Sequence, residues 1–118
     1  MGHLSTHVLD TMHGRPAAGM RVSLARWQGE TLALMQDFRL NADGRFEGGA
    51  LLNAQTLAVG RYRLSFEVAA YFRAIGVELP EPAFIDHVPI DFGIADATGH
   101  YHVPLLVSPW SYSTYRGS

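Results

Sequence analysis

Cysteine is absent from the 118 residues, and so are lysine and any long apolar run. The lack of cysteine excludes disulfide bonds, thiolate nucleophiles, cysteine-ligated zinc and iron–sulfur centres. No stretch approaches the roughly 20 apolar residues of a membrane-spanning helix, and the N-terminal residues contain no apolar segment typical of a signal peptide. A formal net charge of −2 argues against a nucleic-acid-binding surface. We therefore expect a cytoplasmic protein that binds neither nucleic acid nor membrane.

The composition is that of a folded domain. Hydrophobic residues make up 47% and charged residues 17% of the chain, which is not the composition of a disordered or low-complexity segment. A chain of this length can bury roughly two thirds of the surface that it exposes when unfolded. The sequence predicts a single domain over residues 1–118.

Hydrophobic and polar residues alternate along much of the chain. The alternation is clearest in residues 20–25, 32–40, 62–68, 87–94 and 100–107. A period of two indicates β-strands with one buried face and one more polar face. Short strands at this spacing predict an all-β antiparallel sandwich.

Turn-forming residues separate these strands. Residues 13–16 (HGRP) break the first strand from the next, and residues 41–44 (NADG) indicate a tight turn. Residues 68–76 are the one candidate for a helix, which Gly76 could end. Pro89 and Pro104 fall inside apparent strands, so each predicts an edge strand, a bulge or a nitrogen that faces away from a partner strand.

Histidines are the side chains that could carry chemistry. His100 and His102 are two residues apart on a strand and so project from the same face. They could be two surface histidines, an accessible imidazole pair, or two ligands of a metal ion. The metal alternative needs a third ligand, for which His7, His87 or Asp86 is available.

Arg45 follows the turn at residues 41–44, where it is either a solvated charge or, if it points into a pocket, a guanidinium that grips a carbonyl-rich ligand. The carboxylates show no paired spacing, the serines no nucleophile-elbow motif and the glycines no phosphate-binding loop. Residues 108–118 alternate aromatic and small hydroxyl residues and indicate a final, docked strand. The residues alone define no reaction.

Several segments together resemble the transthyretin-like (prealbumin-like) family, and within it the 5-hydroxyisourate hydrolase branch. Residues 4–19 (LSTHVLDTMHGRPAAG) resemble the N-terminal signature, and residues 100–118 (HYHVPLLVSPWSYSTYRGS) resemble the C-terminal one. The latter ends in the tetrapeptide YRGS at residues 115–118, as the enzymes do. NADGR at 41–45 resembles the family's turn after the third strand, and AYFRAIG at 70–76 resembles its short helix.

The resemblance implies a fold, an assembly and a reaction. The fold is a sandwich of two four-stranded sheets with one short helix, and the assembly is a homotetramer with sites at the dimer–dimer interface. The reaction is the hydrolytic ring opening of 5-hydroxyisourate, a small purine-derived substrate of urate degradation. The product is 2-oxo-4-hydroxy-4-carboxy-5-ureidoimidazoline, and no cofactor or metal is implied.

The resemblance also implies site residues. The catalytic positions of the family fall on His7, Arg45 and His102. Its substrate-binding positions fall on Tyr115, Arg116, Gly117 and Ser118. The alternatives that remain open are a carrier that binds a small hydrophobic ligand without turnover, a metal-binding module and a purely structural sandwich.

Overall fold

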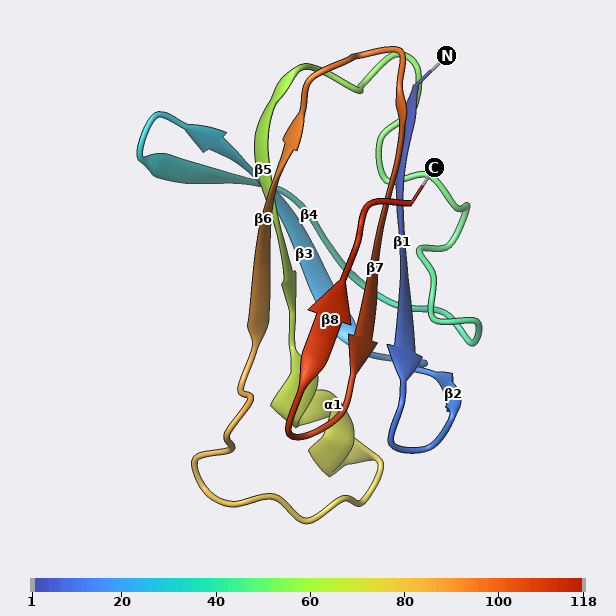
Figure 1. Cartoon of the computed structure of the whole chain (residues 1–118), viewed down its shortest axis with the longest axis vertical. Coiled ribbons are helices and arrows are strands. Elements are labelled where there is room, and N and C mark those ends of the chain that lie inside the picture. The colour runs from blue at the N-terminus through green and yellow to red at the C-terminus, as the bar shows by residue number, and fades with distance from the viewer. Residues whose placement is uncertain (1, 118) are drawn as a thin grey trace.

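The computed structural model describes residues 2–117 as two four-stranded sheets packed face to face (Figure 1). The first sheet contains, in spatial order, β2 (Arg15–Pro16), β1 (His3–Asp10), β7 (His100–Val107) and β8 (Tyr112–Thr114). The second contains β4 (Thr31–Arg39), β3 (Arg21–Gln28), β5 (Gly60–Phe66) and β6 (Val88–Ile94). One helix, α1 (Val68–Ala74), connects β5 to β6. The prediction of an all-β sandwich of two four-stranded sheets with one short helix is confirmed.

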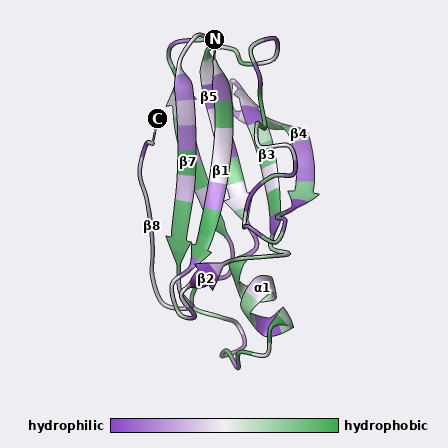
Figure 2. Cartoon of the chain, turned by 90° about the vertical axis from the view of Figure 1, so that its right-hand side faces the viewer, coloured by the Kyte–Doolittle hydropathy of each residue, from purple (hydrophilic) through white to green (hydrophobic). Residues whose placement is uncertain are grey.

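The alternation along β1 separates the core from an outer face. Leu4 and Val8 are completely buried between the sheets, whereas Ser5 and His7 are half-buried on the opposite face. The side chains of β7 that face the core in the same way are Tyr101, Val103, Leu105 and Val107. Figure 2 shows that β7 is hydrophilic over its first half and hydrophobic over its second half. The outer face therefore displays polar side chains over the first halves of the two strands, on a rigid support.

β1 and β7 are parallel, although the sequence predicts antiparallel pairing. Parallel neighbours need a crossover connection, and here almost the whole chain separates the two strands. The register pairs His3 with His100 and Ser5 with His102. Both pairs lie on the outer face, so the N-terminal and C-terminal segments meet there.

The two strand prolines lie where no ladder donor is needed. β6, which contains Pro89, is an edge strand, as predicted. Pro104 lies in the inner strand β7. Its nitrogen points to the same side as that of His102, which donates to the carbonyl of Gly117 at 3.3 Å. The partner β8 pairs with β7 only from Leu105 onward, so Pro104 faces a stretch without a ladder, in agreement with an outward-facing nitrogen.

The hairpin of β3 and β4 departs from the simple alternation. The pattern of residues 32–40 places Leu34 on the buried face, but its side chain is 66% exposed. The register between the two strands shifts at Leu24 and Ala25, and β4 is an edge strand. Beyond this irregularity the hairpin projects past the sandwich (Figure 1). A local pattern contains no signal for such a shift.

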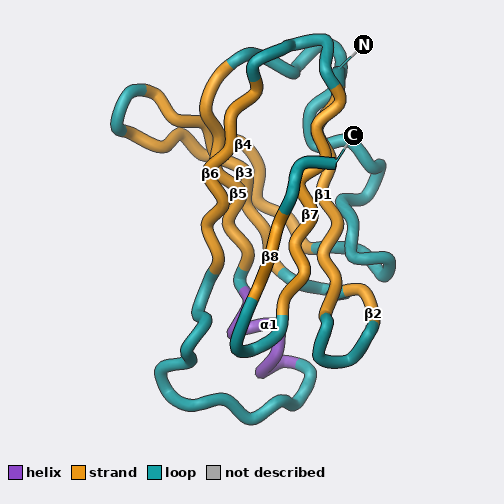
Figure 3. The backbone as a smooth tube through the Cα atoms, viewed as in Figure 1, coloured by secondary structure: helices purple, strands orange, loops and turns teal. Residues whose placement is uncertain are grey.

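The predicted helix and final strand are both shorter than expected. α1 ends at Ala74, and Gly76 adopts a φ of +92°, which glycine tolerates best. The backbone tube shows a long loop after α1 (Figure 3). β8 covers only residues 112–114 of the strand predicted over 108–118, and Gly117 forms an isolated bridge with β7. In the part of the chain that the structure describes, no helix is long and apolar enough to cross a membrane.

Candidate active site

His7 projects from the outer face of β1 and is held by the turn that precedes Arg45. Its Nε2 lies 2.9 Å from the carbonyl oxygen of Asp43. A carbonyl oxygen can only accept, so this nitrogen carries a proton and donates it. The lone pair of a neutral His7 ring is therefore on Nδ1.

The turn at residues 41–44 brings Arg45 beside His7. The side-chain oxygen of Asn41 accepts from the amide of Arg45 at 3.1 Å, which closes the turn. Gly44 has a φ of +74° and approaches β1 so closely that a β-carbon there would lie 2.6 Å from the carbonyl oxygen of Val8. The amide of Val8 donates to the carbonyl of Gly44 at 3.0 Å, and His7 and Arg45 become bridge partners.

The guanidinium of Arg45 is available to a ligand. Most other arginines are engaged: Arg21 forms a two-point ion pair with Asp37, and Arg63 forms one with Asp91. Within residues 2–117, the Arg45 side chain makes neither a hydrogen bond nor an ion pair. An exposed fork of N–H donors beside two histidines can bind carbonyl oxygens or stabilise negative charge on them.

His102 is fixed on two sides of its ring. Its Nδ1 lies 2.8 Å from the hydroxyl of Ser5, directly across the β1–β7 ladder. On the other side, Gly117 bridges to His102 by backbone hydrogen bonds of 2.8 and 3.3 Å. A β-carbon at position 117 would lie 2.9 Å from Cδ2 of the ring. The contact with Ser5 thus orients the imidazole, while Gly117 fixes the backbone of His102 and lies close beside the ring.

The electrostatics of this cluster favour neutral imidazoles. Burial lowers the pKa of His7 below its usual value of 6.5, and the positive charge of Arg45 lowers it further. Burial, Arg45 and then His7 lower the pKa of His102 in the same direction. A neutral ring at neutral pH can accept a proton from water, which is what a general base must do.

The C-terminal residues separate into two groups. Gly117, expected to bind substrate, lies against His102. Arg116 instead stacks over the ring of Tyr101 at 4.3 Å and donates to the carbonyl of His100 at 3.1 Å. Tyr115 is 60% exposed. With Arg116 it lines a separate cavity of about 280 Å³, whose other walls come mainly from β6 and β7. Ser118 lies outside the described residues.

The alternative of a metal site gains no support. His100 shares the outer face with His102, as predicted, and its ring centroid lies 4.4 Å from that of His3. His87 lies in the exposed segment before β6, beside Asp86. Among residues 2–117, no three histidine, aspartate or glutamate side chains are grouped closely enough to hold a metal ion.

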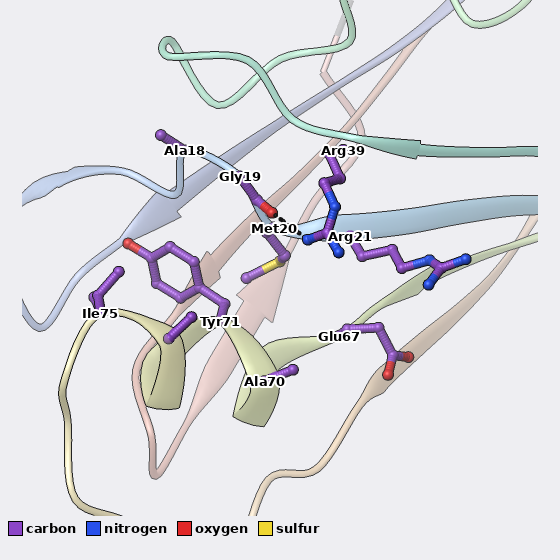
Figure 4. A pocket seen from close by; sticks show the side chains of 10 residues that line it. Ala18, Gly19, Met20, Arg21, Arg39, Glu67, Ala70, Tyr71 and Ile75 are labelled. Carbon is purple, nitrogen blue, oxygen red and sulfur yellow. Dashed lines mark hydrogen bonds between the residues drawn. The ribbon is translucent and has the colours of Figure 1, made fainter.

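A cavity beside α1 has different chemistry (Figure 4). It has a volume of about 300 Å³, and Met20, Tyr71 and Ile75 form part of its wall. Arg39 at its rim donates to the carbonyl of Gly19 at 3.2 Å. This cavity contains no histidine that could activate water, so the outer face of β1 and β7 remains the candidate active site.

Ser5 and Asp43 contribute to the site although the sequence did not single them out. Ser5 lies two residues before His7, so strand alternation places both on one face. That spacing could have drawn attention to Ser5, but its partner depends on the register with β7. The carbonyl of Asp43 is a backbone group, which every residue has, so no residue type in the sequence indicates its role.

Comparison with known proteins identifies the family of this chain. The model of the HIUase/Transthyretin family matches residues 4–117. The 5-hydroxyisourate hydrolase 2 of Rhizobium meliloti strain 1021 is 53% identical over 117 residues, with 99% of this chain and 97% of the relative covered.

Two solved structures extend the comparison. An (S)-allantoin synthase is 47% identical with a TM-score of 0.92, covering 99% of this chain, which spans 44% of that longer chain. A transthyretin from Sparus aurata is 25% identical with a TM-score of 0.83, covering 97% of this chain and 95% of its own. The chain belongs to the HIUase/Transthyretin family.

Proposed function

We propose that this protein hydrolyses 5-hydroxyisourate to 2-oxo-4-hydroxy-4-carboxy-5-ureidoimidazoline in urate degradation. One observation carries the proposal: two imidazoles with lowered pKa values and an unpaired guanidinium share one outer face. These groups are His7, His102 and Arg45. A relative that is 53% identical over nearly its full length bears the name of this enzyme.

The reaction is a cyclic amide hydrolysis that these groups can perform. A neutral imidazole takes one proton from water, and the oxygen of that water bonds to the ring carbonyl carbon. The fork of Arg45 donates to the oxygen on which negative charge develops. The carbon–nitrogen bond then breaks, and the imidazolium returns its proton to the leaving nitrogen. One water is consumed, and the side chains end in their starting states.

A second copy of the chain would complete the site. In one chain the cluster lies on an exposed sheet face, with Arg45 open to solvent. Hydrolysis of this kind benefits from walls that orient the substrate and exclude bulk water. We propose a homotetramer in which this face meets another at the dimer–dimer interface, with residues 115–118 lining the assembled site. Within one chain Tyr115 and Arg116 line a separate cavity, so the assembly would have to bring them to the site. We place this assembly in the cytoplasm, without a nucleic-acid partner.

A carrier without turnover is the alternative function. Transthyretin from Sparus aurata has the same fold, but at 25% identity it is much less similar to this chain than the Rhizobium meliloti hydrolase. The outer face here offers two histidines and a free arginine, which suit a polar ring rich in carbonyl and N–H groups. A hydrophobic ligand would leave these groups without partners, at a cost in affinity.

The test is an absorbance assay with freshly generated 5-hydroxyisourate, corrected for its spontaneous decay. We expect catalytic loss of the substrate signal with the protein and a large reduction with His102→Ala. Decay at the spontaneous rate, together with saturable binding of an iodothyronine, would favour the carrier.

A further inference from the structure

Ser5 contacts His102, one of the two imidazoles of the proposed site. It faces His102 across the parallel β1–β7 ladder, and its Oγ lies 2.8 Å from Nδ1 of His102. The two residues are separated by 97 positions along the chain, so this contact exists only when the first sheet is assembled. Ser5 is half-buried and belongs to an inner strand, so its backbone is fixed.

The contact divides the two nitrogens of His102 between two roles. Nδ1 is occupied by Ser5, whereas Nε2 has no hydrogen-bond partner within residues 2–117. Gly117 lies beside the ring, because a β-carbon at that position would be 2.9 Å from Cδ2. Nε2 is therefore the nitrogen that a water or a substrate can reach.

His7 presents its other nitrogen. The carbonyl of Asp43 holds the proton on Nε2 of His7, which leaves Nδ1 as the accepting atom. Each histidine of the site thus has one nitrogen engaged by the fold and one left for chemistry. The partner of His7 can only accept, whereas the hydroxyl of Ser5 can donate or accept.

We propose that Ser5 is a positioning residue whose hydroxyl accepts the Nδ1 proton of His102, so that the neutral ring keeps its lone pair on Nε2. This inference rests on the proposed hydrolysis. If Ser5 donated instead, the single proton of the neutral ring would be on Nε2, and that nitrogen could not deprotonate water.

A Ser5 hydroxyl that accepts the Nδ1 proton is compatible with both proton transfers, from water to Nε2 and from Nε2 to the leaving nitrogen. When Nε2 takes a proton from water, the bond from Nδ1 to Oγ persists unchanged in the imidazolium. The ring then returns the Nε2 proton to the leaving nitrogen without rotating. The hydroxyl keeps its own proton throughout and can donate it to a water or to a substrate carbonyl.

The experiment combines NMR of 15N-histidine-labelled protein with steady-state kinetics. Spectra are recorded without substrate at a pH where His102 is neutral, and its signals are assigned by their absence in His102→Gln. We expect wild type to show one tautomer with the proton on Nδ1. Ser5→Ala should give a mixture of tautomers and about a tenfold lower kcat, with KM within twofold, while Ser5→Thr should restore both the tautomer and kcat.

Ser65→Ala is the matched control, because Ser65 is a half-buried serine on the outer face of the other sheet. It should leave the tautomer and the kinetics unchanged. A wild-type proton on Nε2, or a Ser5→Ala variant with unchanged tautomer and kcat, would overturn the proposal. The spectra need no turnover, so absence of hydrolysis in wild type would count against the proposed function and leave the tautomer assignment measurable.

Discussion

The backbone of Gly117 lies directly against the imidazole of His102. The amide of Gly117 donates to the carbonyl of His102 at 2.8 Å, and there is no room for a side chain between the two. No positive φ is involved, so the requirement for glycine at this position is steric. The C-terminal segment thereby limits where the imidazole of His102, on the inner strand β7, can lie.

Gly117→Ala should therefore impair catalysis more than folding. The new β-carbon would lie 2.9 Å from Cδ2 of His102 and force the ring to move. We expect kcat to fall about 10- to 100-fold, because displacement of a catalytic group by about 1 Å has effects of this size. Gly93→Ala is the control: its β-carbon meets open space on β6, and its kinetics should match wild type. Equal kinetics for both variants would contradict this prediction.

Substitution of Arg45 should remove much of the activity while the protein stays folded. Its side chain is exposed and makes no hydrogen bond within the described residues, so Arg45→Ala costs little packing. The loss of oxyanion stabilisation should lower kcat by roughly 100- to 1,000-fold. Arg61→Ala, an exposed arginine of β5 on the other sheet, should retain activity. Thermal unfolding checks that both variants fold, and full turnover by Arg45→Ala would remove this residue from the site.

The charge of Arg45 should be visible in the titration of His102. Burial first and Arg45 second hold the pKa of His102 below 6.5. A protonated His102 cannot accept a proton from water, so the reaction stops when the ring is charged. Activity should therefore be constant around neutrality and fall only below pH 6.5. Arg45→Gln removes the positive charge and should raise the pKa of His102, as measured by NMR titration. An unchanged or lower pKa in Arg45→Gln would show that Arg45 does not act on the ring.

Asp10 should be important for stability because it is fully buried among donors. Its carboxylate accepts from the amide and ring Nδ1 of His13 at 3.0 and 2.7 Å and from the hydroxyl of Tyr71 at 2.8 Å. Asp10→Ala should lower the free energy of unfolding by about 2–4 kcal/mol, since buried donors lose their acceptor. The exposed Asp37→Ala should cost much less. Denaturant titration of both variants measures the difference.

The stabilisation by Asp10 should also depend on pH. Burial raises the pKa of Asp10, but the hydrogen bonds from His13 and Tyr71 outweigh this effect and leave the pKa below its usual value of 3.8. A lowered pKa means that stabilisation by the ionised group is complete above the unfolded-state value and is lost as pH falls through the folded-state value. The stability gap between wild type and Asp10→Ala should narrow below about pH 4. A gap that widens there would contradict the assignment.

Local patterns in the sequence predict the strands because burial has a period of two. The alternation of residues 62–68 and 100–107 gives the buried faces of β5 and β7 correctly, and it places His100 and His102 on one face. The pattern fails at Leu34, because a register shift between β3 and β4 is a property of the pair of strands. Each strand alone specifies its faces and not its partner.

The site needed information that no local pattern contains. The family resemblance indicates His7, Arg45 and His102, whereas the residue types alone leave solvated surface side chains as an alternative. The contact of Ser5 with His102 depends on the parallel register of strands that are 97 residues apart. The proton on His7 depends on a backbone carbonyl at Asp43. Three-dimensional contacts, rather than composition, thus determine which nitrogen of each histidine is engaged by the fold.

The central claim is that His102 and Arg45 act together on one substrate molecule. A double-mutant cycle of kcat/KM, with wild type, His102→Ala, Arg45→Ala and the double variant, tests this claim most directly. Residues that act in one transition state give strongly non-additive losses. We predict that kcat/KM of the double variant is only slightly below that of the less active single variant. Losses that multiply in full would contradict a shared site.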